Sequence, residues 1–168
     1  METSRLRFRK VTPDDYDRCL PFFQHPLSHR YWKTEGQSPE ALCDAWMNRQ
    51  RWRYENGKGG ALALIDKESH ALVGWCGLLI QEVDQSEVVE VGYSIMPDHW
   101  GKGYATEASR ACIDHAFNHA WCESIISIIQ VDNIESRRVA EKNGMTISRE
   151  TTYHGNEVFI YVISKSGS

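Results

Sequence analysis

The fold of this chain is decided by residues 90–108, which read EVGYSIMPDHWGKGYATEA. Val88–Ile95 has the composition of a β-strand, and a turn containing Gly101 and Gly103 then leads into a helix near Tyr104. A helix N-terminus leaves free N–H groups and a partial positive charge, so such a turn can bind a phosphate group. An ordinary tight turn also favours glycine, so this spacing alone leaves both interpretations open.

The residues before this segment, together with the strand that leads into it, predict four strands and two helices. Thr12-Pro13 and Ser38-Pro39 are helix-start signals, and the second precedes a helix over Ala41–Tyr54. Between the two helices lies a polar and aromatic loop, His25–Gln37. Short polar turns separate the last three strands, which suits antiparallel hairpins. The four strands are predicted at Arg5–Val11, Gly60–Asp66, Ala71–Val83 and Val88–Ile95.

The residues after this segment predict a helix, a strand, a short helix and a closing hairpin. These are Tyr104–Trp121, Ser124–Val131, Asn133–Lys142, and the pair Thr146–Tyr153 and Val158–Ser164. A helical crossover makes the two strands that it connects parallel neighbours. We therefore predict an α+β fold with a mixed, mostly antiparallel central sheet flanked by helices. No linker or repeat divides the sequence, so residues 1–168 are expected to form one domain.

The composition excludes several classes of protein. The 168 residues carry a net charge of −4, which argues against a nucleic-acid-binding surface. No apolar run is long enough to span a membrane, and the N-terminus lacks a signal-peptide pattern, so we expect a cytoplasmic protein. The five cysteines include no CxxC pair and are expected to be free. His115 and His119 have a metal-chelating spacing without an obvious third ligand, so no metal site is predicted.

A second segment complements the glycine turn. Asn133-x-x-Ser136 and Glu141-Lys142-Asn143-Gly144-Met145 follow the strand after the crossover. Together with Gly92-Tyr93 and Trp100–Ala108, this segment resembles the GNAT superfamily of N-acetyltransferases, and within it the RimJ/RimL-like branch. The order of the remaining elements fits the same pattern, so the resemblance covers essentially the whole chain. It implies the GNAT acyltransferase fold and acetyl-CoA as co-substrate.

The resemblance also implies where acetyl-CoA binds. The pantetheine arm would bond to the backbone of the strand at Ser94, Ile95 and Met96. The pyrophosphate would be held by the turn and the helix start, which are Gly101, Lys102, Gly103, Tyr104, Ala105 and Thr106. Asn133 stands where the family uses an Asn side chain on the pantetheine amide, although it can equally cap the following helix. Arg137-Arg138 can contact the 3′-phosphate or simply be solvated.

Two residues are candidates for catalysis. Many members of the superfamily place a Tyr acid seven residues after the Asn, but this chain has Ala140 there. Ser136 is the nearest hydroxyl by position and can donate a proton, or it can be an ordinary helix-start residue. Glu90 is the candidate base, since a buried carboxylate can have a raised pKa, or it is a paired strand residue. A backbone N–H near Ile95 or Met96 would stabilise the oxyanion.

The acceptor is expected to be a primary amine. An α-amine with a pKa of about 8 is partly neutral at pH 7, so a protein N-terminus suits the RimJ/RimL-like resemblance. A polyamine or a drug amine is an alternative, and so is a non-catalytic module that binds or senses acyl-CoA. Tyr31, Trp32 and Tyr93 would line the acceptor cleft, or contribute only to packing. Exposed strand edges and aromatic residues are compatible with a homodimer.

Overall fold

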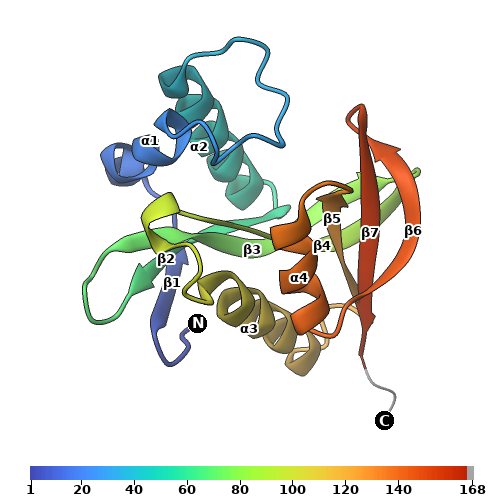
Figure 1. The fold of residues 1–168 in the computed structure, drawn as a ribbon. Helices are drawn as coiled ribbons and strands as arrows, with labels where there is room; N and C mark the ends of the chain where they lie inside the picture. Colours follow the sequence, from blue (N-terminus) through green and yellow to red (C-terminus); the bar gives the residue numbers. More distant parts are fainter. Residues whose placement is uncertain (166–168) are drawn as a thin grey trace.

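A seven-stranded sheet forms the centre of the computed structural model, which describes residues 1–165 (Figure 1). The strand order is β1-β2-β3-β4-β5-β7-β6, and every neighbouring pair is antiparallel except β4 and β5. The strands are β1 (Leu6–Lys10), β2 (Gly59–Asp66), β3 (Leu72–Val83), β4 (Ser86–Ile95), β5 (Ser124–Gln130), β6 (Thr146–Tyr153) and β7 (Asn156–Ser164). The predicted α+β class and the predicted parallel pair are both confirmed.

Four α-helices connect and cover the strands. They are α1 (Tyr16–Gln24), α2 (Pro39–Glu55), α3 (Tyr104–Asn118) and α4 (Ile134–Lys142), with short 3₁₀ turns at Pro13–Asp15 and Pro97–His99. The predicted order of elements is confirmed, although the helix expected at Pro13 begins as a 3₁₀ turn. The helix after the glycine turn ends at Asn118 and not at Trp121, because Ala120 has a φ of 53°, outside the helical region.

The helices cover both faces of the sheet. Because alternate residues of a strand point to opposite faces, Leu64 and Ala63 of β2 belong to different cores. The core on one face contains Ala108, Cys112 and Ala116 of α3, and these small side chains let the helix lie close to the sheet. The core on the other face packs α1 and α2 against β2 and β3 (Figure 1). None of the cysteines of residues 1–165 is in a disulfide, as predicted.

Strands β4 and β5 separate after a short contact. Their backbones pair at one position, Glu90 with Ile126, whereas β3 and β4 are paired from Val83 and Ser86 to Gly74 and Ile95. Side chains replace part of the missing ladder, since Ser127 Oγ donates a 3.1 Å hydrogen bond to the Val91 carbonyl. This separation opens the sheet at the end of β4, next to the start of α3.

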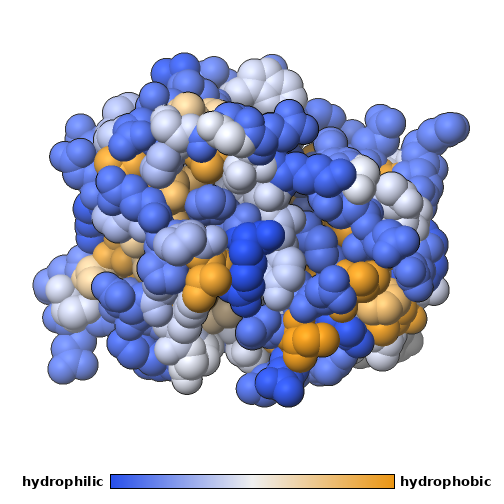
Figure 2. All heavy atoms as spheres, turned by 45° about the horizontal axis from the view of Figure 1, so that its top comes forward, coloured by the Kyte–Doolittle hydropathy of each residue, from blue (hydrophilic) through white to orange (hydrophobic). Residues whose placement is uncertain are grey.

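One face of the molecule is mainly hydrophilic, with small and separate apolar areas (Figure 2). Polar side chains therefore supply most of the surface on that face. No helix among residues 1–165 is long and apolar enough to cross a membrane. Within the same residues, no group of three or more His, Cys, Asp or Glu side chains is arranged to hold a metal ion.

Candidate active site

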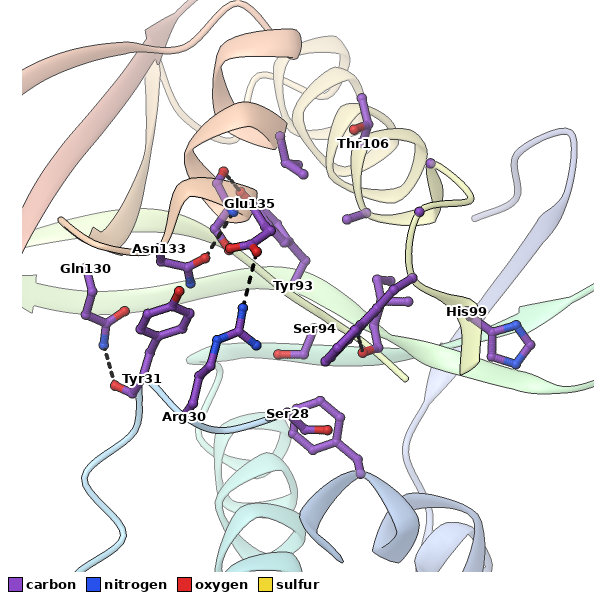
Figure 3. Close-up of a pocket in the computed structure, with 18 of the residues that line it drawn as sticks. Ser28, Arg30, Tyr31, Tyr93, Ser94, His99, Thr106, Gln130, Asn133 and Glu135 are labelled. Atoms are coloured by element: carbon purple, nitrogen blue, oxygen red, sulfur yellow. Dashed lines mark hydrogen bonds and ion pairs between the residues drawn. The ribbon is translucent and has the colours of Figure 1, made fainter. Parts of the chain in front are cut away.

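A cavity of about 430 Å³ lies where β4 and β5 separate. The starts of α3 and α4 border it on one side, and the segment between α1 and α2 borders it on the other (Figure 3). We call residues 94–106 the turn wall and residues 25–38 the loop wall. The cavity brings together eleven of the predicted site residues, which are Tyr31, Trp32, Tyr93, Ser94, Ile95, Gly101, Gly103, Ala105, Thr106, Asn133 and Ser136.

The turn wall has the geometry of an anion site. Gly101 and Gly103 have φ values of 74° and 80°, a conformation that strains any residue with a Cβ atom. Gly103 is the N-cap of α3, and no side chain among the described residues caps this helix. The first amides of α3 therefore keep free N–H groups beside the cavity, where Ala105 and Thr106 line it.

Three residues of the predicted donor site, Lys102, Tyr104 and Met96, are absent from the lining of the cavity. The Lys102 ammonium donates to the Asp98 carbonyl at 3.0 Å and lies outside the cavity lining. Tyr104 is buried and its hydroxyl donates to Asp66 at 2.8 Å, so only its backbone remains near the cavity. The Met96 side chain is buried in the core under α1 and α2, and its N–H donates to the Val73 carbonyl at 2.9 Å. Binding of acetyl-CoA by the backbone at these three positions stays a prediction.

The backbone of Ile95 faces the cavity instead. The N–H groups of consecutive residues in a strand point to opposite edges of that strand. Because the Met96 N–H points toward β3, the Ile95 N–H points toward the opening beside β5. The Ile95 carbonyl accepts a 2.7 Å bond from the indole N–H of Trp100. The predicted backbone donor of an oxyanion or a pantetheine group is thus Ile95 rather than Met96.

The start of α4 forms the side of the cavity opposite β4. Asn133 is the N-cap of α4, and its Oδ1 accepts a 3.1 Å bond from the Ser136 N–H (Figure 3). Its amide nitrogen can still donate to a ligand, so the capping role and a binding role are compatible. The Ser136 carbonyl accepts a 2.9 Å bond from the Tyr93 hydroxyl. Burial raises the pKa of Tyr93, which keeps this phenol neutral.

Glu90 lies at the point where β4 and β5 separate but does not line the cavity. Its Oε2 accepts a 2.8 Å bond from Gln81, and its Oε1 lies 3.4 Å from the Ile128 amide of β5. Burial raises the pKa of Glu90, and the Gln81 bond and the positive charge of Arg53 offset this shift only in part. A carboxylate with a raised pKa suits a general base, which can act directly or through water.

The loop wall is attached to the rest of the molecule through its own side chains and backbone. The Tyr31 hydroxyl donates to the Asp132 carbonyl at 3.2 Å, and Gln130 donates to the Tyr31 carbonyl at 2.7 Å. Trp32 packs on Phe22 at a ring separation of 5.8 Å while 38% of its surface stays exposed. Tyr31 and Trp32 therefore make contacts within the fold and also line the cavity, and their contact with an acceptor stays a prediction.

Comparison with known proteins identifies the family. The family model named Acetyltransferase (GNAT) domain matches residues 5–146. The chain belongs to the GNAT acetyltransferase family. YkkB of Bacillus subtilis (strain 168) is 33% identical over 165 residues, which cover 95% of this chain and 92% of YkkB.

Solved structures of acetyltransferases have the same fold. An acetyltransferase from Agrobacterium tumefaciens matches with a TM-score of 0.79 and 23% identity, over 98% of this chain and 94% of the other. RimL, a ribosomal L7/L12 α-N-protein acetyltransferase solved with coenzyme A, matches with a TM-score of 0.74 and 15% identity, over 96% and 95% of the two chains. At these identities the likeness concerns the fold, and the family match identifies the chain as an acyltransferase.

Several residues of this GNAT cavity were not selected from the sequence. Arg30 of the loop wall and Glu135 of α4 form an ion pair at 3.4 Å beside the cavity. Ser28, His99, Gln130 and Lys142 also line it. No local pattern marks these residues, because their proximity follows from the packing of distant segments. Ala140, where other members of the superfamily have Tyr, is fully buried, so no hydroxyl replaces that Tyr at this position.

Proposed function

We propose that this acyltransferase moves the acetyl group of acetyl-CoA to a primary amine that enters the same cavity. The observation that carries the proposal is the uncapped start of α3, which opens onto the cavity through two glycines in the left-handed conformation. Backbone N–H groups at a helix start bind diphosphate without requiring a charged side chain. The acetyl thioester supplies an activated carbonyl that an amine can attack directly.

The residues for holding acetyl-CoA are distributed along one path. The N–H groups of Gly103, Ala105 and Thr106 would bind the pyrophosphate at the turn wall. The Ile95 backbone and the Asn133 amide would bind the pantetheine arm, with Ser94 between them. The separation of β4 and β5 leaves the end of this path open to the side where the acceptor arrives. The fit supports acetyl-CoA as the donor.

Proton transfer would involve residues of β4 and α4. Glu90 would accept the proton of the attacking amine through water, because its raised pKa makes it a stronger base than an exposed Glu. The Ile95 N–H would stabilise the oxyanion of the tetrahedral intermediate. Ser136 would hydrogen-bond to the leaving thiolate and relay a proton to it from water, so that the hydroxyl ends the step protonated. The demand is small because the thiol has a pKa of about 8.5 and can also leave as the thiolate.

The acceptor class has two candidates. An α-amine with a pKa of about 8 needs little help to become neutral, so a protein N-terminus is one, in keeping with the RimJ/RimL-like motifs. A small-molecule amine is the other candidate acceptor, because the loop wall borders the cavity and limits its volume to about 430 Å³. A cavity of this size suits a small ligand beside the pantetheine arm.

Release of the CoA thiol in the presence of amine panels tests the proposal. We expect the wild type to release CoA only with acetyl-CoA and an acceptor, with the acetylated amine detected by mass spectrometry. Ser136→Ala should lower kcat about tenfold without changing the affinity for acetyl-CoA. Micromolar binding of acetyl-CoA with no transfer to any amine would favour the non-catalytic module instead.

A further inference from the structure

The guanidinium of Arg30 is held over the cavity by the loop wall. Its Nη1 donates a 2.7 Å bond to the Leu27 carbonyl. Its central carbon lies 4.7 Å from the ring centroid of Tyr31 and 5.9 Å from that of Trp100. Stacking on aromatic rings fixes the plane of a guanidinium and leaves its edge free to donate. Arg30 is therefore oriented before any ligand binds (Figure 3).

The ion partner of Arg30 is easily exchanged. The Arg30 Nη2 lies 3.4 Å from Glu135 Oε1, which is longer than an ordinary charge-assisted hydrogen bond. The Glu135 side chain is 70% exposed, and exposed ion pairs of this kind contribute little to stability. A carboxylate thus already occupies the position beside the guanidinium, and a ligand carboxylate can replace it when Glu135 turns toward solvent.

A second polar group on the same wall lacks a partner. The hydroxyl of Ser28 is buried and makes no hydrogen bond to any of residues 1–165, and Ser28 lines the same cavity. A buried hydroxyl without a partner costs free energy, and the Ser28 oxygen has almost no accessible surface. A ligand therefore gives it a partner once the Ser28 side chain rotates toward the cavity. Ser28 and Arg30 are two residues apart, and Figure 3 shows both on the loop-wall side of the cavity.

The charges of the cavity match an anion better than a cation. Among the described lining residues, Glu135 is the one carboxylate, and it is already paired with Arg30. Arg30 and Lys142 are the lining residues with full positive charges. Glu90 lies outside the lining and is bonded to Gln81. A polyamine would need several free carboxylates here and would meet positive charge instead.

We propose that Arg30 and Ser28 bind an anionic group of the amine acceptor, a carboxylate or a phosphate, which displaces Glu135. The acceptor is then a small primary amine that carries its own negative charge. This inference rests on the proposed acetyl transfer and specifies its substrate class. The diphosphate of acetyl-CoA would bind at the turn wall, so the donor and the acceptor each have a separate site for their negative charge.

Matched acceptor pairs test this inference. One arm compares α-amino acids with their carboxamides, and the other compares aminoalkyl phosphates with the corresponding amino alcohols. For the best pair we expect kcat/KM at least tenfold higher for the anionic member. Carboxamides have the more neutral amine, so a preference for the acid would oppose intrinsic reactivity. The arm that shows the preference identifies the anion as carboxylate or phosphate.

Variants locate the preference at Arg30. Arg30→Gln should raise KM for the anionic acceptor at least tenfold and leave the neutral member within twofold. Glu135→Gln should lower KM for the anionic acceptor, because the competing carboxylate is gone. Arg51→Gln, the same change on the exposed surface of α2, should alter neither value.

Three results would overturn the inference. Neutral acceptors used as well as anionic ones would exclude an anion site for the acceptor. A loss of acetyl-CoA affinity in Arg30→Gln, with unchanged acceptor preference, would make Arg30 a ligand of the donor. Binding of acetyl-CoA without transfer to any amine would contradict the proposed function itself, which distinguishes that failure from a failure of the anion site alone.

Discussion

The turn wall and the loop wall of the cavity are stabilised by different kinds of contact. The turn wall is fixed by backbone conformation and by buried bonds such as Tyr104 to Asp66. The loop wall is attached through partly buried and exposed side-chain contacts, including the 2.7 Å bond from Gln130 to the Tyr31 carbonyl and the 2.8 Å bond from Lys33 to the Gly155 carbonyl. An exposed side-chain contact contributes little to the stability of the fold. The backbone conformation of the turn, by contrast, is fixed by the packing of the whole sheet and of the helix that follows. The difference suits the proposed assignment, with a fixed donor site at the turn wall and an adaptable acceptor site at the loop wall.

A network from the N-terminal segment supports the turn wall. Arg5 donates to the Lys102 carbonyl at 2.9 Å and forms an ion pair with Glu107 of α3 at 2.6 Å. Thr3 donates to the same carboxylate at 2.6 Å. Burial alone would raise the pKa of Glu107, but the bonds from Thr3 and Arg5 outweigh it and lower the pKa. Arg5 thereby neutralises a carboxylate beside the proposed diphosphate site.

The largest effect is expected at Glu90, which belongs to neither wall and lies in the sheet where β4 and β5 separate. Glu90→Gln removes the proposed base, so kcat should fall about 100-fold. In the wild type, kcat/KM should fall at low pH with an inflection above the ordinary Glu value of about 4.3, because burial raises the pKa of Glu90. The variant should lose this limb of the pH profile. Steady-state kinetics from pH 5 to 9 measure both.

Stability provides a second measurement for Glu90. A carboxyl group whose pKa is raised in the folded state stabilises the fold below its unfolded pKa, and this contribution is lost as pH rises through the folded pKa. Glu90→Gln should therefore gain thermal stability relative to the wild type as pH increases. Glu87→Gln, on the exposed start of the same strand, should change neither activity nor this trend. A difference in thermal stability between Glu90→Gln and the wild type that stays constant across pH would contradict the raised pKa of Glu90.

The next effect concerns the support of the turn wall. Arg5→Gln leaves Glu107 uncompensated beside the donor site, so the affinity for acetyl-CoA should fall about tenfold, or roughly 1.4 kcal/mol. Arg7→Gln, two residues later in β1, removes an exposed ion pair with Glu2 and should leave the affinity unchanged. Calorimetry measures both. The double variant Arg5→Gln/Glu107→Gln should recover part of the loss, and purely additive losses would exclude a role for charge compensation.

The smallest effect is expected on the loop wall. Lys33→Ala removes one exposed bond to the β6–β7 turn, so the melting temperature should change by less than about 2 °C. Acetyl-CoA affinity should stay within twofold, and only the acceptor KM should respond. Differential scanning fluorimetry and steady-state kinetics measure these quantities. A loss as large as that of Arg5→Gln would show that the loop wall is as firmly held as the turn wall.

The sequence predicts the fold well because its signals are local. Ser38 caps α2 through a 3.2 Å bond to the Ala41 amide, and Asn133 caps α4, as their residue types indicate. The glycine turn is predictable for the same reason, since φ is a property of single residues. The crossover follows from the order strand, helix, strand.

The sequence predicts side-chain placement less well because partners are distant. Tyr104 turns away from the cavity toward Asp66, which is 38 positions earlier in the chain. The Met96 side chain is likewise buried among residues of α1, α2, β2 and β3, which are distant in the sequence. Arg30 and Glu135 meet only because the loop wall folds over the start of α4. Such contacts form only in the assembled fold, so they cannot be predicted from the pattern of residues along the sequence.

The central claim is that the start of α3 and its glycine turn bind acetyl-CoA. Calorimetric titration of the wild type, Ala105→Trp and Asp114→Trp tests it most directly. Ala105 lines the cavity in a helical conformation that accepts a Trp, whereas Asp114 is exposed farther along the same helix. We predict micromolar binding by the wild type and by Asp114→Trp, and at least a 100-fold loss in Ala105→Trp. Equal binding by all three folded proteins would contradict the claim.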